Sequence, residues 1–260
     1  MTKSVWVTAA LIFGLVSFLT LPANATDIPL YTYHDGGPFI VDKDTGLTIE
    51  LSKYLTAEAK GRWAFPVIAL PRLRLNKTIQ SAENGVVPWV SPFWFKKLNL
   101  KNDLWTSPYL KDANVIVSHV DNKIDYAGPE SLFGFTVVSV LGAVKQTLEP
   151  YIKLGKINQI HTPVFGGHIK MLAAKRGDFV STSLTIAQYM ISKFNLTKKL
   201  YISSRPDDNY TRHFLVLNGR KDIQLFLNQT IFKMATDPIW LAVLEKFGAA
   251  DLRVAKPESQ

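Results

Sequence analysis

Short apolar segments alternate with segments of helical periodicity along this chain, and this alternation limits the fold more than any other feature. Buried strands are predicted at residues 27–33, 63–70 and 86–90, and helices between them at 48–60 and 73–82. The order strand, helix, strand, helix, strand is typical of a parallel sheet whose connections are helices. The first part of the chain therefore predicts an α/β unit.

The alternation restarts further along the chain. More elements are predicted there, namely strands at 113–120, 135–140, 157–161, 179–183, 200–203 and 213–217 and helices at 145–153, 166–176, 186–194, 222–235 and 237–247. Asp237 and Pro238 are typical of a helix start, and Gly248 of a helix end. The predicted fold class is α/β with two lobes, each an open and mostly parallel sheet flanked by helices. Such lobes enclose a cleft at the carboxyl ends of their strands.

An apolar segment precedes the first strand. It has a positively charged start at Lys3 and an almost unbroken apolar run over residues 5–21. Ala23 and Ala25 are small residues at the two positions that a signal peptidase recognises. This pattern predicts a secretory signal peptide over residues 1–25. The alternative is a membrane anchor, for which the run is at the short end.

Charge and cysteine content narrow the compartment and the partners. The chain has no cysteine, which excludes disulfides and thiolate chemistry. It has 30 basic and 21 acidic residues, and loss of Lys3 with the signal peptide leaves a net charge of +8 (29 − 21). A basic, exported chain is expected in a bacterial periplasm, where it attracts anions. No basic run exceeds two residues, so no nucleic-acid partner is predicted.

The segment after the strand at 86–90 combines bulky rings with positive charge. It reads SPFWFKKLNLKNDLWTSPYL over residues 91–110. Because it follows a strand end, we expect it to form one wall of the cleft, and the alternative is a solvated loop. Trp94 is expected to stack on a flat ligand or to fill space beneath the segment. Lys96 and Lys97 are ligand contacts or solvated charges.

Several short motifs occur in a set order between residues 28 and 248. They are Gly37-Pro38-Phe39, Gly46-Leu47, Pro71 with Arg74, Trp105-Thr106-Ser107-Pro108-Tyr109, Leu132-Phe133-Gly134, Lys175-Arg176-Gly177-Asp178 and Glu245-Lys246-Phe247-Gly248. In order and spacing they resemble the periplasmic amino-acid-binding proteins of ABC importers, which are type II solute-binding proteins of bacterial extracellular solute-binding protein family 3.

The resemblance implies an arrangement and a function. It implies two crossover strands, near residues 114–118 and 200–209. It also implies a division into lobe 1 at residues 26–112 and 206–250, lobe 2 at 113–205, and a C-terminal tail at 251–260. The expected function is closure of the lobes on a small solute, which is then delivered to an inner-membrane ABC permease.

The residues that hold a free amino acid in this family are replaced at the matching positions. The resemblance implies an arginine for the carboxylate, two small hydroxyl residues, and an acid for the ammonium. The arginine is replaced by Asn99, the two hydroxyl residues by Ala143 and Val144, and the acid by Ser183. At Gly142, which precedes the hydroxyl positions, only backbone donors remain. These losses predict a solute that is not a conventionally bound amino acid. The missing acid favours an anionic or neutral solute, and the rings favour an aromatic one; a protein that has ceased transporting is the alternative.

The candidate ligand-binding residues follow predicted strand ends or open the helices after them. They are Tyr33, Arg74, Trp89, Ser91, Trp94, Lys96, Lys97, Gly142, Ala143, Val144 and Ser183. No catalytic residue or cofactor is predicted, and no histidine has metal-ligand spacing, so no metal is predicted either. Two other functions stay open. One is a periplasmic sensor or accessory interaction protein with the same fold. The other is an enzyme similar to the cyclic-acid dehydratases of this fold, for which the cleft segments offer only Asp35.

Overall fold

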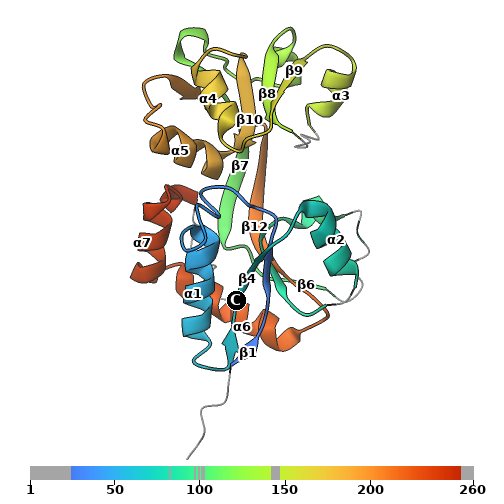
Figure 1. The fold of residues 1–260 in the computed structure, drawn as a ribbon, viewed down its shortest axis with the longest axis vertical. Helices are drawn as coiled ribbons and strands as arrows, with labels where there is room; N and C mark the ends of the chain where they lie inside the picture. The colour runs from blue at the N-terminus through green and yellow to red at the C-terminus, as the bar shows by residue number, and fades with distance from the viewer. Residues whose placement is uncertain are drawn as a thin grey trace, which may run out of the picture.

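The computed structural model describes residues 25–252, except residues 82, 97, 99, 101–102 and 142–146. The chain forms two α/β lobes joined by two long strands, and we name the lobes lower and upper after their places in Figure 1. The predicted fold class is confirmed. The predicted signal peptide (apart from Ala25) and most of the predicted tail lie outside the described residues. Within those residues, no helix is both long and apolar enough for a membrane span.

The lower lobe is built on three parallel strands in the order β4-β2-β5. Its strands are β1 (Thr26–Asp27), β2 (Leu30–Thr32), β3 (Trp63–Ala64), β4 (Val67–Ala69), β5 (Val86–Val90) and β6 (Leu104–Trp105). Its helices are α1 (Leu47–Glu58), α2 (Arg72–Gln80), α6 (Lys221–Met234) and α7 (Pro238–Lys246), with the 3-10 turns η1 (Pro92–Phe95) and η4 (Ala250–Leu252). The strand predicted at 63–70 is divided in two, with Phe65 and Pro66 between β3 and β4.

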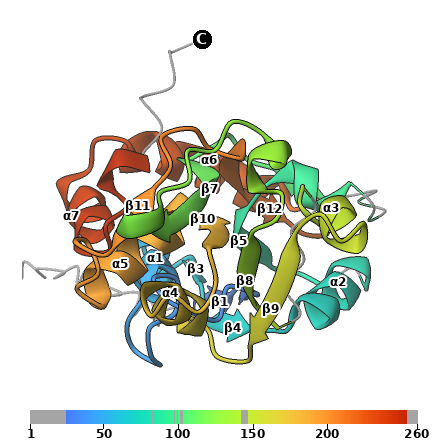
Figure 2. The ribbon, with the colours of Figure 1, turned by 90° about the horizontal axis from the view of Figure 1, so that it is seen from above.

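The upper lobe has the parallel strands β10, β8 and β9 in that order. Its strands are β8 (Thr136–Val140), β9 (Asn158–Thr162), β10 (Phe179–Ser183) and β11 (Leu200–Ile202). Its helices are α3 (Glu149–Lys153), α4 (Gly167–Ala173) and α5 (Leu184–Lys193), with the 3-10 turns η2 (Val120–Asn122) and η3 (Pro129–Leu132). Seen along the long axis, α1, α5 and α7 lie on one side of the strands and α2 and α3 on the other (Figure 2).

Two antiparallel strands connect the lobes. They are β7 (Leu110–His119) and β12 (Asp208–Val216), and Arg212 lies opposite Leu110 in their register. Because β12 also pairs with β5 and β7 with β10, one sheet continues through both lobes. The crossing predicted at 200–209 is placed too early, since β11 pairs with β7 inside the upper lobe and β12 makes the crossing.

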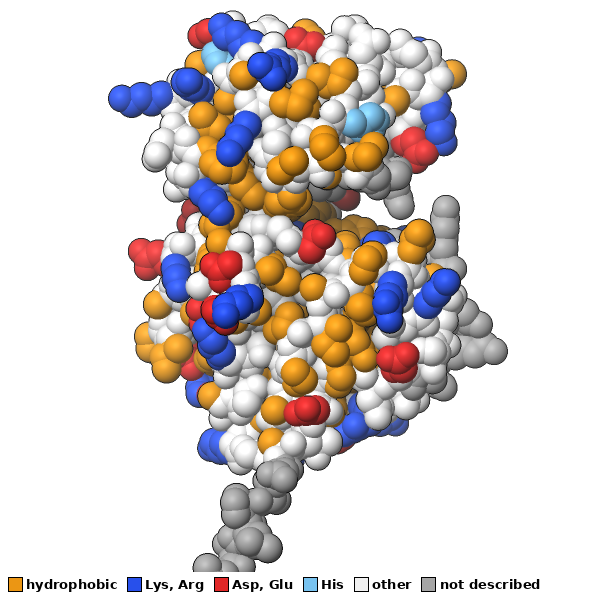
Figure 3. Space-filling view, viewed as in Figure 1, with side chains coloured by type: hydrophobic (Ala, Val, Ile, Leu, Met, Phe, Trp, Pro, Cys, Tyr) orange, Lys and Arg blue, Asp and Glu red, His pale blue; other side chains and the backbone are white. Residues whose placement is uncertain are grey.

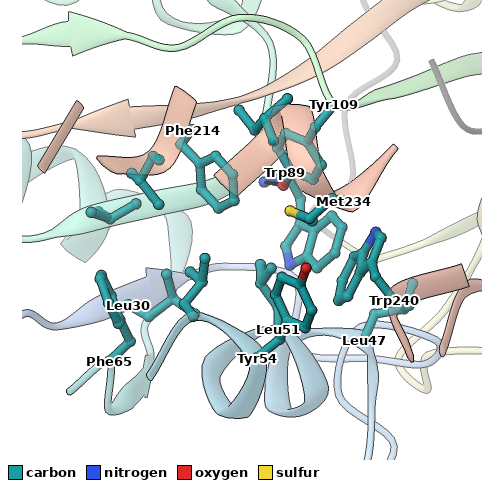
Figure 4. Packing of buried hydrophobic residues seen from close by; sticks show 14 of the residues in the cluster. Leu30, Leu47, Leu51, Tyr54, Phe65, Trp89, Tyr109, Phe214, Met234 and Trp240 are labelled. Atoms are coloured by element: carbon teal, nitrogen blue, oxygen red, sulfur yellow. Dashed lines mark hydrogen bonds between the residues drawn. The ribbon is translucent and has the colours of Figure 1, made fainter. Parts of the chain in front are cut away.

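The largest cluster of buried side chains lies in the lower lobe, between its sheet and helices α1, α6 and α7. Figure 4 shows Trp89 stacked near Trp240, with a distance of 6.5 Å between the ring centroids. The predicted start of α7 is confirmed, because the Asp237 side chain accepts a hydrogen bond from the Ile239 N–H at 2.9 Å. Tyr54 donates its hydroxyl to the other Asp237 oxygen and so ties α1 to α7.

Candidate solute-binding cleft

The lobes face each other with the carboxyl ends of their parallel strands. In the lower lobe, β4 ends towards the upper lobe, and β2 and β5 run parallel to it. In the upper lobe, the parallel strands β8, β9 and β10 end towards the lower lobe. Figure 3 shows a hollow between the lobes whose visible walls are mostly hydrophobic, with Lys and Arg side chains on the lower lobe at its edge. This is where an open α/β sheet binds ligands. We name this hollow the cleft.

Strand β5 carries an irregularity just before it reaches the cleft. Val87 lies opposite Leu215 and Val90 opposite His213, so β5 has one residue more than β12 over this stretch. Trp89 takes up the extra residue with a φ of 65°, in the left-handed region. Such a conformation costs a non-glycine residue about 1–2 kcal/mol. Bulges of this kind redirect the side chains that follow them, here those at the cleft.

Three hydrogen bonds hold Trp89 in this conformation. Its backbone N–H donates to the Tyr109 hydroxyl at 2.8 Å, and its indole Nε1–H donates to Thr48 Oγ1 at 3.0 Å. Its carbonyl oxygen accepts from Arg212 Nη1. Since the Trp89 side chain is fully buried, each of these bonds replaces contacts with water that the chain has lost.

Replacing Tyr109 with phenylalanine is expected to lower the free energy of unfolding by about 1–3 kcal/mol, because it leaves the buried Trp89 N–H without an acceptor. Urea denaturation followed by tryptophan fluorescence measures the change. Tyr201→Phe is the control, because the exposed Tyr201 hydroxyl donates to Asp125. It should lower the free energy of unfolding by less than half as much. Equal losses from both variants would contradict this account of the bulge.

A buried ion pair lies where β7 and β12 cross between the lobes. Arg212 donates from Nε and Nη2 to Asp112 Oδ2, at 2.9 and 2.7 Å. The side chain of Arg212 is only 1% exposed and that of Asp112 is fully buried. A buried charge needs a partner and saturated hydrogen bonds to be tolerated. The pair has both, because Arg212 also donates to the Trp89 carbonyl and to the Tyr210 hydroxyl.

Asp112 connects this ion pair to the upper lobe. Its Oδ2 accepts from the Thr185 hydroxyl at 2.7 Å, and its Oδ1 accepts from the Thr185 N–H at 3.3 Å. Thr185 lies in the first turn of α5, where a carboxylate is favoured by the helix dipole. A single network therefore joins Trp89 in the lower lobe, both connecting strands and α5 in the upper lobe.

Aromatic rings surround the Arg212 guanidinium. The guanidinium carbon lies 5.0 Å from the ring centre of Phe39, 5.5 Å from that of Trp94 and 5.4 Å from that of Tyr210. Trp94 packs edge-on against Tyr210, with a distance of 4.9 Å between centroids. The faces of these rings attract cations, so the protein's own arginine occupies the position that a cationic ligand group would favour.

A second arginine holds the wall formed by α2 and η1. Arg72 donates to the Trp94 carbonyl at 2.9 Å and to Asn76 Oδ1 at 3.0 Å. Its guanidinium carbon lies 4.7 Å from the ring centre of Tyr33 and 4.2 Å from that of Phe95. Burial raises the pKa of the Tyr33 hydroxyl, while Arg72 and Arg212 act to lower it. Tyr33 therefore lies under the influence of two positive charges.

The same two arginines also affect the pKa of His34. Its ring stacks on Phe39 at 4.6 Å, and its Nε2 is buried with no hydrogen-bond partner in the described ranges. Burial lowers the pKa of His34 well below its ordinary value of 6.5, Arg212 and Arg72 lower it further, and only a contact with the Trp89 backbone opposes them. His34 is therefore neutral around pH 7.

The free energy of unfolding is expected to fall as the pH decreases from about 6.5 towards the folded-state pKa of His34. In this window the unfolded chain takes up a proton at His34 and the folded protein does not. The free energy of unfolding therefore changes by at most about 1.4 kcal/mol per pH unit. His213, whose pKa is lowered by burial, adds a smaller, water-screened contribution. Asp222, with a pKa lowered first by its hydrogen bond from Arg220, loses its contribution only below about pH 4.

Urea denaturation of the His34→Asn variant between pH 5 and 7 measures this slope. The variant should be markedly less sensitive to pH than the unaltered chain. The exposed His161 is the control, and its replacement by asparagine should leave the slope in place. A slope that survives in His34→Asn would show that its source lies elsewhere.

The two lobes also touch directly across one side of the cleft. A Cβ atom added at Gly36 would lie closer than 3.0 Å to the ring of Phe165, and one added at Gly37 would lie equally close to the ring of Tyr189. Neither glycine has a positive φ, so the need for glycine here comes from close approach rather than from backbone conformation. Tyr189 also lies beside Phe247, with a distance of 6.4 Å between centroids.

The structure places the sequence-predicted site residues in different surroundings. Tyr33 and Trp94 lie in the aromatic cluster around the arginines. Ser91 is fully buried, and its hydroxyl has no hydrogen-bond partner among the described residues. Trp89 is a core residue beneath the cleft, and Ser183 is the N-cap of α5, where its hydroxyl accepts from an N–H at 3.3 Å.

The remaining predicted site residues are exposed or not described. Arg74 is exposed on α2, and Lys96 is exposed with its ammonium 4.4 Å from the ring centre of Phe93. The other four predicted residues lie outside the described part of the chain, namely Lys97, Gly142, Ala143 and Val144.

Sequence reasoning missed the charged pair at the base of the cleft. Asp112 and Arg212 are buried charged residues within strands whose neighbouring positions are mostly apolar or buried, and a charge at such a position is a signal available in the sequence. It also missed the contacts of Phe165 and Tyr189 with the Gly36-Gly37 turn, which depend on how the lobes meet. Of these two features, only the charge within a predicted strand can be recognised from a sequence alone.

Comparisons with known proteins agree with this architecture. No protein-family model matches the chain, and no curated protein matches it. Among solved structures, an ancestral arginine-binding protein bound to arginine is similar over 86% of this chain and 99% of its own, with a TM-score of 0.66 and 19% identity.

Two further structures show the range of proteins with this shape. A histidine kinase sensor domain with similarity to periplasmic binding proteins covers 86% of this chain and 96% of its own, with a TM-score of 0.64 and 18% identity. A structure concerned with glutathione import via GshT and the cystine ABC importer TcyBC of Streptococcus mutans covers 90% of this chain and 100% of its own. Its TM-score is 0.69 and the identity is 16%. At these identities the similarity is one of fold. The chain has the two-lobed fold of periplasmic binding proteins.

Proposed function

We propose that this chain is a periplasmic solute-binding module that closes its lobes on a small solute and presents it to an inner-membrane ABC permease. The observation that carries the proposal is that both lobes turn the carboxyl ends of their parallel strands towards one cleft. The N-terminal segment with the pattern of a signal peptide supports a periplasmic location. A solute that contacts both lobes stabilises the closed arrangement by its differential affinity for it.

The same geometry favours binding over catalysis. Among the described acidic residues only Asp112 and Asp237 are buried, and Asp237 caps α7 away from the cleft. Asp112 is held by Arg212 and Thr185 and is not free to transfer a proton. His34 is neutral and lies among aromatic rings, and no carboxylate of the described residues hydrogen-bonds to it to orient it as a general base. These surroundings fit a module that binds its solute unchanged.

The candidate contacts are the residues around the cleft. Tyr33, Ser91 and Trp94 supply the floor on the lower lobe, Arg74 and Lys96 the charges at its edge. Ser183, at the N-terminus of α5, supplies the upper wall. Residues 142–144 stay predicted contacts outside the described residues. The guanidinium, hydroxyl pair and acid with which the resembling family holds a free amino acid are replaced in this sequence, so the solute is not held as a zwitterion.

A sensor or accessory protein is the second candidate function. It is favoured by one observation, the similarity of the fold to a histidine kinase sensor domain. Both functions need the same cleft and differ in the membrane partner. Stimulation of ATP hydrolysis by a permease in proteoliposomes, on addition of the loaded module, would distinguish an importer component from a sensor.

A thermal-shift screen tests whether the module binds a solute at all. It would cover amino acids, dicarboxylates, short peptides and aromatic acids. A ligand at a hundredfold its dissociation constant should stabilise the chain by about 2.7 kcal/mol. If no compound in these classes shifts the unfolding transition, solute binding is not the function, and a purely structural or interaction role replaces it.

A further inference from the structure

The described part of the cleft offers a positive potential and no free buried carboxylate. Asp112 is the one buried acid there, and its oxygens accept from Ala113, Thr185 and Arg212. Five hydrogen bonds exceed the roughly four lone-pair positions of a carboxylate. An ammonium group entering the cleft therefore finds no buried acceptor among the described acids. The nearby Asp35 and Asp208 are exposed to water, which screens their charge.

Positively charged side chains predominate on the lower-lobe wall of the cleft. Arg72 lies against the ring of Tyr33, with 4.7 Å between its guanidinium carbon and the ring centre, whereas the charge of Arg212 is shared with Asp112. Both arginines lower the pKa of His34, after burial, which lowers it most. Arg74 and Lys96 add exposed charges on the lower lobe. The aromatic faces that would attract a ligand cation already surround Arg212. Both effects disfavour a cationic ligand group and favour an anionic one.

Two buried polar atoms at the ends of β2 and β5 have unused hydrogen-bonding capacity. Ser91 is fully buried, and within the described part of the chain its Oγ has no partner; the Nε2 of His34 is likewise buried without one there. A buried hydroxyl is normally paired, so an unpaired one directly after β5, a strand that ends at the cleft, leaves a donor for a partner from outside the chain. A carboxylate oxygen can accept from the Ser91 hydroxyl.

Exposed apolar side chains follow the strands that end at the cleft. Leu73 follows β4 and Phe93 follows β5, with 78% and 64% of their surfaces exposed. In the upper lobe, Leu141 follows β8 and Val164 follows β9, with 66% and 62% exposed. Because all four follow strands that end at the cleft, we expect them to line it, and a large exposed apolar patch indicates a binding site. The hydrophobic walls visible in Figure 3 continue this pattern into the cleft.

We infer that the cleft selects monocarboxylates that have an aromatic or branched apolar body and lack an ammonium group. The inference rests on the proposed function and names the class of solute for that site. The carboxylate lies in the positive field beside Ser91, and the apolar body contacts the side chains after β4, β5, β8 and β9. The α-ammonium of an amino acid would be desolvated there without an acid to accept it, which weakens binding.

Isothermal titration with matched ligand pairs tests the inference. The pairs are 3-phenylpropanoate with phenylalanine and 4-methylpentanoate with leucine, which differ only in the ammonium group. We expect the carboxylates to bind at least about tenfold more tightly than the amino acids, because an unpaired buried charge is costly. The neutral 3-phenylpropanamide should also bind at least about tenfold more weakly than its acid.

Variants locate the carboxylate. Ser91→Ala should weaken 3-phenylpropanoate binding about 10- to 100-fold, the loss expected for a hydrogen bond to a charged group. It should leave the unfolding midpoint unchanged, since no bond within the protein is removed. Ser181→Ala is the matched control, because that hydroxyl is also buried and unpartnered but lies within β10. It should leave binding unchanged.

The titrations and the thermal screen together distinguish failure of the inference from failure of the proposed function. Equal or tighter binding of phenylalanine or leucine overturns the inference and leaves the proposed function standing. Failure of both carboxylates to bind also overturns it, and the proposed function then stands if another solute stabilises the chain in the thermal screen. If no solute does so, both fall. Equal losses from Ser91→Ala and Ser181→Ala would contradict the location of the carboxylate.

Discussion

Replacing Arg212 with methionine is expected to lower the free energy of unfolding by about 3–5 kcal/mol, the cost of leaving one partner of a buried ion pair without the other. In this variant Asp112 stays buried without its counter-charge, with only Thr185 and backbone donors to offset its burial. The carbonyl of Trp89 also loses its donor. Chemical denaturation gives the free energy, and the slope with denaturant shows whether unfolding stays cooperative.

The double variant Asp112→Asn, Arg212→Met separates the ion pair from simple loss of packing. Asparagine keeps the shape of Asp112 and can still accept from Thr185, but it has no charge to leave unpaired. The double variant should therefore be more stable than Arg212→Met alone, as expected for two residues in contact. A loss in the double variant equal to the sum of both single losses would mean that the two charges do not stabilise each other.

Adding methyl groups to the Gly36-Gly37 turn is expected to keep the lobes apart. In the double variant Gly36→Ala, Gly37→Ala, each new Cβ meets the ring of Phe165 or Tyr189 at less than 3.0 Å. Overpacking costs about 1–3 kcal/mol per site, so about 2–6 kcal/mol opposes the arrangement in which the lobes touch. Because affinity scales with the population of the competent state, solute binding should weaken at least about 30-fold.

A compensating substitution serves as the control for this effect. Phe165→Ala removes the ring that a methyl group at Gly36 would meet, so Gly36→Ala combined with Phe165→Ala should bind better than Gly36→Ala alone. Thermal unfolding of each variant shows whether the lower lobe itself is intact. Unchanged solute affinity in the double glycine variant would show that the contact between the turn and the upper lobe plays no part in closure.

Local signals in the sequence predicted much of the fold. Strand β5 has the predicted bounds, and α7 begins as predicted because Asp237 and Pro238 specify a helix start without help from the rest of the chain. The short strand β6 was missed, since two residues carry no periodicity. The connection by β12 was placed too early, because a strand that crosses between lobes looks the same in sequence as one inside a lobe.

The site was less predictable because its parts meet only in the folded protein. Asp112 and Arg212 are 100 residues apart in sequence, and the register of β7 with β12 brings them together. The left-handed conformation of Trp89 has no sequence signal, since a tryptophan rarely adopts it and three distant residues hold it there. The positions of Tyr33 and Trp94 after strand ends were predictable, because strand ends define the cleft, and their contact with a solute stays a prediction.

The distance between the lobes tests the central claim most directly. The chain has no cysteine, so spin labels can be attached at Lys77→Cys on α2 and Leu154→Cys after α3, two exposed positions on opposite sides of the cleft. The distance distribution between them would be measured with and without the solute that stabilises the chain most. Binding between the lobes predicts a shorter and narrower distribution in the presence of the solute. A stabilising solute that leaves the distribution unchanged would contradict capture between the lobes.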